Sequence, residues 1–168
     1  MLKRFNFLYL KIKKRFFYFL YTNMTIQERQ DNFVNIFEGL NDWESKYELI
    51  INYGRNLLPF DEVYRTDKYK IDGCQSQVWI YAEFNEGRIK FSADSDAQIV
   101  KGLIALLLAV YNDATPDEIL SSPPAFLKKI GIDNHLSPTR KNGLNAMLKQ
   151  IQLYALAYKK LGSLQNSN

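Results

Sequence analysis

The sequence predicts an α+β fold, with a three-stranded antiparallel sheet and helices packed mainly on one face of it. Apolar residues alternate with other residues over 77–84 and 88–93, and the turn-forming Asn85-Glu86-Gly87 between them predicts a β-hairpin. A short strand at residues 68–71 completes the predicted sheet. Elsewhere apolar residues recur every three or four positions, as on the buried side of a helix. A length of 168 residues, 46% of them hydrophobic and 24% charged, suits a single domain.

Two helices are predicted before the sheet. Thr25 and Glu28 have the spacing of a capping box, which opens a helix of about a dozen residues. Asn41 or Asp42 caps a second helix, and Gly54 is well placed to end it. The residues expected to face the core are Phe33, Ile36, Phe37, Leu40, Trp43, Tyr47, Ile50 and Ile51.

The most apolar helix is predicted directly after the sheet. Ser95 and Gln98 have the capping-box spacing, and the residues that follow are apolar nearly all round, which is typical of a central helix. Gly102 lies inside this helix, where glycine costs up to about 1 kcal/mol relative to alanine. We therefore expect another element to pack closely against it.

Three more helices are predicted towards the C-terminus. The sequence Thr-Pro-Asp-Glu at 115–118 opens the first, a short helix over 125–130 follows, and Ser-Pro-Thr-Arg at 137–140 opens the last long one. The tail from Gly162 is polar, and we expect it to be frayed. The inward residues of the last helix are predicted to be Leu144, Met147, Leu148, Ile151, Ala155 and Tyr158.

Residues 1–23 differ from the rest of the chain, since they contain six basic residues, no acidic residue and many Phe and Tyr. The other 16 basic residues are matched by 18 acidic ones, so the net charge of +4 does not indicate nucleic-acid binding. The segment resembles neither a bilayer span nor a signal or transit peptide. We expect residues 1–23 to be an extension outside the fold, 24–162 the domain and 163–168 a polar tail. The alternative for the extension is a basic aromatic helix on a membrane surface.

Cys74 is the only cysteine, so an internal disulfide is excluded and nothing indicates an oxidising compartment. Gly73 precedes it and apolar alternation resumes after it, which predicts a tight turn between two strands. A thiolate there can attack a sulfur–sulfur bond and later pass the sulfur on, so one cysteine suffices to carry sulfur as a persulfide. From the spacing alone, the alternative is a buried cysteine that packs as a small hydrophobic residue.

Three blocks of sequence together resemble the SufE family of sulfur acceptors. They are GCQSQVW at 73–79, DSDAQIVKGLIA at 94–105 and HLSPTR at 135–140, and the likeness covers roughly residues 25–160. The resemblance implies a SufE-like fold, related to that of the iron–sulfur scaffold family. It also implies a cytoplasmic sulfur carrier that is not itself an enzyme.

The resemblance implies specific partners for this carrier. Cys74 would take persulfide sulfur from a cysteine desulfurase of the SufS or CsdA kind, stimulate that enzyme, and relay the sulfur to an iron–sulfur assembly complex of the SufBCD kind. The desulfurase uses pyridoxal phosphate, whereas no cofactor is expected in this chain. We expect no nucleic-acid partner, no membrane association except through residues 1–23, and a monomer or homodimer.

Other site residues are assigned with Cys74. Arg140 stands in the first turn of a helix, where a positive charge is unfavourable by several tenths of a kcal/mol. In the family this arginine lies near the cysteine loop, so stabilising an anionic persulfide or docking the desulfurase is its expected role. Asp96 suits a helix's first turn electrostatically, and its family position also lies near the partner-binding surface. The loop and partner-binding residues are therefore predicted to be Gly73, Gln75, Ser76 and Asp96.

Two other functions are open at this stage. Cys74 and His135 could form the nucleophile and base of a thiol transferase or hydrolase, although no local signature of such enzymes is present. The chain could also be a purely regulatory protein that binds and stimulates a desulfurase without carrying sulfur. A bound metal is not expected, because one cysteine and one histidine leave too few ligands.

We expect the cysteine loop to have two states. Apolar neighbours predict that the resting thiol is tucked against the hydrophobic edge of the sheet, where burial disfavours the thiolate. Transfer from a partner enzyme requires the loop 72–76 to turn outward, and Gly73 is best able to absorb that backbone change.

Overall fold

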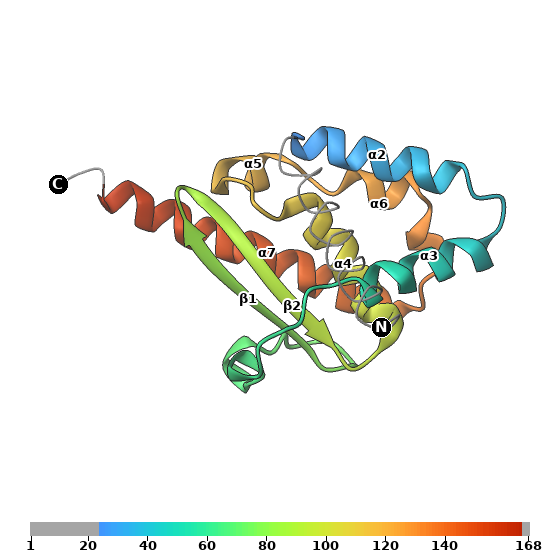
Figure 1. Cartoon of the computed structure of the whole chain (residues 1–168), viewed down its shortest axis with the longest axis horizontal. Coiled ribbons are helices and arrows are strands. Elements are labelled where there is room, and N and C mark those ends of the chain that lie inside the picture. The colour runs from blue at the N-terminus through green and yellow to red at the C-terminus, as the bar shows by residue number, and fades with distance from the viewer. Residues whose placement is uncertain (1–23, 166–168) are drawn as a thin grey trace, which may run out of the picture.

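The computed structural model describes residues 24–165 and confirms an α+β fold (Figure 1). The elements in chain order are α2 (Ile26–Glu38), α3 (Trp43–Arg55), the 3₁₀ helices η1 (Glu62–Tyr64) and η2 (Asp67–Tyr69), β1 (Val78–Asn85), β2 (Arg88–Ser95), α4 (Gln98–Tyr111), α5 (Pro116–Ser121), α6 (Ala125–Lys129), η3 (Ile132–Asn134) and α7 (Pro138–Gln165). The predicted extension, residues 1–23, lies outside the described residues and stays a prediction.

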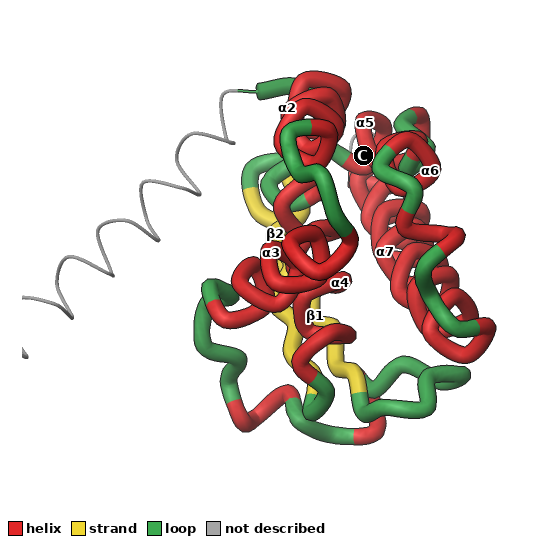
Figure 2. Tube along the Cα trace, turned by 90° about the vertical axis from the view of Figure 1, so that its right-hand side faces the viewer, coloured by secondary structure: helices red, strands yellow, loops and turns green. Residues whose placement is uncertain are grey.

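Helix α4 is the centre of the molecule, as its apolar sequence predicts. Most of its residues are buried, and α3, β2 and α7 all pack against it. In Figure 2, α3 lies on one side of α4 and α7 on the other. Because neighbouring elements cover most of its surface, α4 needs almost no charged residue. No helix within residues 24–165 is long and apolar enough to cross a bilayer.

The crossing of α3 and α4 depends on two glycines. A Cβ built on Gly54 would lie 2.7 Å from the backbone nitrogen of Gly102, and a Cβ on Gly102 would overlap the backbone of Ile50. The expected close packing at Gly102 is thus confirmed. Gly54 does not end α3 as predicted, because the helix continues to Arg55 and Asn56 is its C-cap.

Among the described residues the sheet has two strands, so the predicted third strand is not found. β1 and β2 pair antiparallel around a two-residue turn, Glu86-Gly87, in which both residues have positive φ. The segment expected to be the third strand contributes one bridge, between Lys70 and Trp79, and its first residues belong to η2.

The outer edge of β1 is covered by α7 instead of by a strand. The tyrosine hydroxyls of α7 reach the carbonyl oxygens that point away from β2: Tyr154 donates to Ile80 at 3.1 Å and Tyr158 to Ala82 at 2.8 Å. These bonds satisfy the edge that a third strand would otherwise use, because a buried carbonyl needs a partner. A single sequence pattern cannot reveal this, since the tyrosines are more than 70 residues from the strand.

The two faces of the hairpin are covered differently. Val78, Ile80 and Ala82 face the core and are buried, as predicted. On the other face the ring of Tyr81 stacks on Tyr64 with centroids 3.6 Å apart, and the Arg65 guanidinium lies over Trp79. The helices α4 and α7 therefore pack on one face, while the segment with η1 and η2 covers the other.

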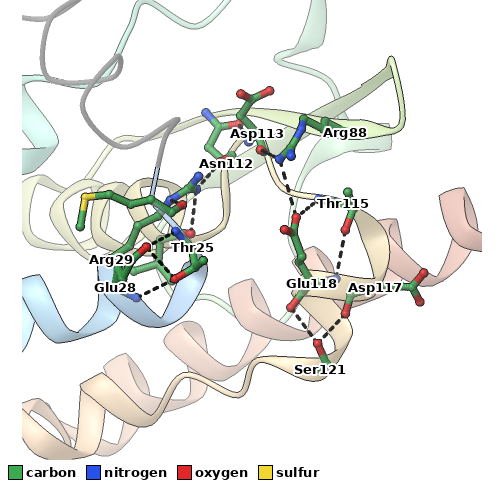
Figure 3. A network of polar contacts seen from close by, with 12 residues as sticks. Thr25, Glu28, Arg29, Arg88, Asn112, Asp113, Thr115, Asp117, Glu118 and Ser121 are labelled. Carbon is green, nitrogen blue, oxygen red and sulfur yellow. Dashed lines mark hydrogen bonds and ion pairs between the residues drawn. The ribbon is translucent and has the colours of Figure 1, made fainter.

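A polar network holds the end of α4 and the outer edge of β2 (Figure 3). The buried Arg29 donates to the carbonyl oxygens of Val110 and Asn112 at 3.1 and 2.6 Å. The side chain of Asn112 bonds both backbone groups of Phe91, at 2.8 and 3.4 Å. Arg29 thus places a positive charge at the C-terminal end of α4, where the helix dipole favours it.

Four of the predicted capped helix starts are confirmed and one is wrong. Capping boxes open α2 at Thr25 and α5 at Thr115, and the Asp42 side chain caps α3. The Ser137 hydroxyl accepts from the backbone nitrogen of Arg140 at the start of α7. The box predicted at Ser95 does not form: α4 begins later than that pattern requires, with Ala97 as N-cap and no side-chain cap bond. At the other end of the chain, α7 includes residues 163–165, which the sequence assigned to a polar tail.

Candidate functional site

Cys74 lies on the irregular loop between η2 and β1, after the Lys70–Trp79 bridge. This is a loop before a strand, and not the tight turn between two strands that the sequence predicts. Gly73 has a φ of +84°, a conformation that side chains disfavour, so the predicted need for glycine is confirmed. The thiol is half-buried.

The loop is fixed at its two ends. Ile71 donates to the carbonyl of Val78 at 2.8 Å, and the backbone of Gln77 donates to the Asp96 carboxylate at 3.0 Å. The backbone nitrogen of Asp96 in turn donates to Gln77 at 3.3 Å. Asp96 precedes the N-cap of α4, so it ties the loop to the end of the hairpin and is not in the first turn of the helix as predicted.

A cavity of about 120 Å³ lies beside the thiol, between three elements. The loop contributes Cys74, Gln75 and Ser76, while the rest of the lining comes from the N-terminal parts of α4 and α7. The α4 side is Ala97, Ile99 and Val100, and the α7 side is Thr139, Arg140, Gly143 and Met147. The structure therefore brings Arg140 to Cys74, as the resemblance implies.

Gly143 of α7 lies directly against the thiol. The Cys74 sulfur lies 3.8 Å from its carbonyl oxygen, and a Cβ on residue 143 would lie 3.4 Å from the sulfur. The glycine lets the thiol rest directly on the helix. Sequence reasoning did not select Gly143, although a glycine inside a long helix, at a cost of about 1 kcal/mol, was a usable signal.

The cavity affects the neutral resting thiol and an anionic sulfur differently. Burial raises the pKa of the Cys74 thiol, so the resting form is protonated near neutral pH. The first turns of α4 and α7 both line the cavity, however, and helix N-termini favour anions. Arg140 is exposed at the rim, and its backbone nitrogen bonds the Ser137 hydroxyl at 3.4 Å. An anionic sulfur in the cavity would meet two helix N-termini and a guanidinium.

His135 is engaged elsewhere. Its ring stacks on Trp43 with centroids 3.5 Å apart, its backbone oxygen accepts from the Tyr47 hydroxyl, and it does not line the cavity beside Cys74. The structure does not bring the two residues of the thiol-enzyme hypothesis together. Within residues 24–165 no group of three or more His, Cys, Asp or Glu side chains could hold a metal ion.

An ion cluster around the buried carboxylate of Asp94, next to the loop, was missed by sequence reasoning. Asp94, at the end of β2, pairs with Arg65 and has the Lys101 Nζ 2.5 Å from its other oxygen. Burial works to raise the pKa of Asp94, but hydrogen bonds from Lys101 and Arg65 outweigh it and lower that pKa. The cluster fixes the segment before the cysteine loop to β2 and α4, and only the fold reveals it, because 29 residues separate Arg65 from Asp94.

Comparisons with known proteins agree on one family. The family model described as "SufE: Fe-S metabolism associated domain" matches residues 31–155. The chain is 42% identical over 124 residues to "SufE-like protein 1, chloroplastic/mitochondrial" of Arabidopsis thaliana, covering 73% of this chain and 33% of that protein. It is 37% identical over 136 residues to an uncharacterized SufE-like protein of Synechocystis, covering 81% of this chain and 86% of that protein. The chain thus spans about a third of the Arabidopsis protein's length.

A solved structure is similar in fold. It is the solution structure of a hypothetical protein from Thermus thermophilus, with a TM-score of 0.65 and 21% sequence identity. The likeness covers 77% of this chain and 94% of that one. At this level of identity it shows a shared fold alone.

Proposed function

This chain belongs to the SufE family, and on that basis we propose that it is a sulfur carrier in iron–sulfur cluster assembly. In this proposal Cys74 accepts sulfane sulfur from a cysteine desulfurase, and the protein then delivers it to an iron–sulfur assembly scaffold. Family membership supports the coarse role in iron–sulfur metabolism. The observation that carries the finer role is the placement of the only cysteine at an open cavity between two helix N-termini.

The proposed step is a thiol–persulfide exchange in which atoms and charge balance. The Cys74 thiol first loses its proton, and the thiolate attacks the terminal sulfur of a cysteine persulfide on the desulfurase. The sulfur–sulfur bond of that persulfide breaks, and the desulfurase cysteine leaves as a thiolate. Cys74 then carries the sulfur as its own persulfide, and no external oxidant or reductant is needed.

The cavity suits the product of this step better than its resting thiol. A persulfide is one sulfur atom longer than a thiol and is more readily an anion. The cavity of about 120 Å³ has room for that atom, and the first turns of α4 and α7 favour its charge. Arg140 at the rim would hold the anion or contact the desulfurase.

Transfer needs the loop to move. In the resting structure the thiol faces Gly143, where burial raises its pKa and keeps it unreactive. An incoming persulfide on another protein requires the sulfur to face outward. We propose that docking shifts residues 72–76 from this shielded state to an extended one, with Gly73 absorbing the backbone change.

Partners and compartment follow from the family role. The desulfurase would be SufS-like or CsdA-like and would bring its own pyridoxal phosphate, and the acceptor would be SufBCD-like. One relative is named as chloroplastic/mitochondrial, so the cytoplasmic location that the sequence suggested stays a prediction. The oligomeric state stays a prediction as well.

Replacing Cys74 by serine separates the carrier from a regulator. If the protein is a carrier, Cys74→Ser still binds the desulfurase but no longer stimulates its turnover, because the persulfide on the desulfurase has no acceptor. A purely regulatory protein stimulates turnover equally well without the thiol, and that result would reject the carrier role. His135→Ala is the matched control, and it should accept sulfur at the normal rate because His135 lies outside the cavity.

A further inference from the structure

An aspartate or asparagine is followed by glycine at two positions in the sequence, and both are close to the thiol. Asp72-Gly73 is in the cysteine loop and directly precedes Cys74. Asn142-Gly143 is in α7, where Gly143 lies against the sulfur. In such a pair the glycine nitrogen can attack the side-chain carbonyl carbon of the residue before it, because glycine has no side chain to hinder the approach. The backbone at both positions is therefore chemically able to rearrange.

The pair in α7 is held by the helix. Gly143 lies in the second turn, where each backbone nitrogen donates to the carbonyl oxygen four residues earlier. Gly143 is also buried, and a Cβ built there would lie 3.4 Å from the Cys74 sulfur. To attack the side chain of Asn142, the Gly143 nitrogen would have to give up its helical bond and move within a packed helix. The helix therefore opposes the reaction at Asn142.

The pair in the cysteine loop has no such restraint. Within the part of the chain that the structure describes, no backbone nitrogen of residues 72–76 donates a hydrogen bond, and the bonds of Ile71 and Gln77 hold only the ends of the loop. Asp72 and Gly73 are both exposed, and nothing lies within 4 Å of a Cβ built on Gly73. The carboxyl group of Asp72 has no hydrogen-bond or ion-pair partner among the same residues. The nitrogen and the carboxyl group that must meet are thus both unrestrained.

We propose that Asp72-Gly73 is a site of spontaneous isomerisation, at which an aspartate of the cysteine loop becomes isoaspartate. The Gly73 nitrogen attacks the side-chain carboxyl carbon of Asp72, and one water leaves as a five-membered succinimide ring forms. A second water opens the ring at the former main-chain carbonyl, so the backbone then continues through the side chain of residue 72. One water is lost and one is gained, so the mass is unchanged and no oxidant or reductant takes part.

The rearrangement would move the thiol. Isoaspartate places one more carbon atom in the backbone and lengthens it by about 1.5 Å, two residues before Cys74. Because the bonds of Ile71 and Gln77 fix the ends of the loop, the residues between them have to take up the added length. The sulfur, which rests 3.8 Å from the carbonyl oxygen of Gly143, should leave that contact and become more exposed. This consequence does not depend on the sulfur-carrier function, since it concerns only where the thiol lies.

Ageing of the full chain in warm neutral buffer with a reductant tests the inference. Synthetic peptides that span residues 69–77 and 139–147 give the reaction rates of the two pairs without the fold. Chromatography of tryptic digests separates isoaspartate from aspartate at equal mass, and mass spectrometry detects the deamidation of Asn142. Asp72→Glu is the matched variant, because it keeps the charge but would need a six-membered ring, which forms far more slowly. Circular dichroism checks that both proteins stay folded.

The same digest reports the position of the thiol. Asp72 and Cys74 lie on one tryptic peptide, which begins after Lys70 and ends at Arg88. The aged protein is alkylated briefly while folded, and the remaining thiol is labelled with a second reagent after unfolding. The ratio of the two labels then compares Cys74 in altered and unaltered molecules of one sample.

In the folded chain, Asp72 should isomerise within about fivefold of its peptide rate, whereas Asn142 should react at least about tenfold more slowly than in its peptide. Asp72→Glu should show no isomerisation at residue 72, and Cys74 should be alkylated several-fold faster in isoaspartate molecules. Protection of Asp72 as strong as that of Asn142 would overturn the proposal, because the loop would then be as restrained as the helix. Equal alkylation of the two forms would overturn the predicted movement of the thiol.

Discussion

Two glycines in helix interiors allow close approach, and what approaches them differs. Gly102 of α4 receives the backbone of Ile50 from another helix, and there is no space for a Cβ. Gly143 of α7 receives the side chain of Cys74 from a loop, at a distance where a Cβ would just make contact. The first is a fixed crossing in the core, whereas the second is a contact that a loop can leave. The close backbone contact therefore fixes the helical framework, whereas the thiol is held by a contact that can break.

The largest expected effect is at the fixed crossing. Gly102→Ala forces α3 and α4 apart and should lower the free energy of unfolding by about 3 kcal/mol. Denaturation in urea measures the change. Gly162→Ala is the matched control, because nothing lies near that position, and it should stabilise the helix by up to about 1 kcal/mol. Equal stability of Gly102→Ala and wild type would show that the crossing is adaptable.

The ion cluster that anchors the segment before the cysteine loop should have the next largest effect. Asp94→Asn should lower stability at neutral pH by about 1 to 2 kcal/mol, a value reduced because Arg65 and Lys101 are partly exposed. The lowered pKa of Asp94 gives stability that is present above its unfolded value of about 3.9 and is lost as pH falls through the folded value.

Urea denaturation at a series of pH values checks this. Wild type should lose stability below about pH 4 more steeply than Asp94→Asn does. Glu38→Gln, at the exposed end of α2, should leave the profile unchanged. Parallel profiles for wild type and Asp94→Asn would show that the ion pairs do not anchor the segment.

The tyrosines that cover the edge of β1 should have a smaller effect. Tyr158→Phe removes the hydroxyl that bonds Ala82 and should cost about 1 kcal/mol. Tyr69→Phe keeps the ring packing against Tyr64 and Tyr81, and its expected cost is lower. Thermal unfolding compares the two. If Tyr69→Phe proves the more costly of the two, the edge of β1 does not depend on the hydroxyls of α7.

The smallest effect on stability is expected at the movable contact. Gly143→Ala should change the free energy of unfolding by no more than about 1 kcal/mol, since a better helix former offsets a tighter contact. It should nevertheless push the thiol outward and speed alkylation of Cys74 several-fold. Because burial raises the pKa of Cys74, the wild-type rate should keep rising above about pH 8.5. Slower alkylation in the variant would mean that the added methyl group locks the loop closed.

Features that depend on local sequence patterns could be predicted, whereas features that depend on contacts between distant residues could not. Capping at Thr25 and Thr115, the central α4 and the hairpin at Glu86-Gly87 follow from local patterns, and the structure confirms them. The prediction of a third strand failed because tyrosine side chains of the distant helix α7 bond the edge of β1 where that strand would pair. The box predicted at Ser95 does not form because Ser95 is the last residue of β2, and its hydroxyl accepts a hydrogen bond from the Ala97 backbone nitrogen before the helix begins.

The residues of the site also fall into two groups, those that the sequence could select and those that only the fold reveals. The sequence could select Cys74 and Gly73 from the loop and Arg140 from its motif, and the structure brings Cys74 and Arg140 to one cavity. Gly143 and Asp94 act through contacts made by residues far apart in the chain. Their roles depend on packing that spacing alone does not encode.

Mass spectrometry of the protein after incubation with a cysteine desulfurase and cysteine tests the central claim most directly. The account predicts one added sulfur on the peptide that contains Cys74, removed by a reductant and absent from Cys74→Ser. A desulfurase that turns over while Cys74 gains no sulfur would contradict the carrier function.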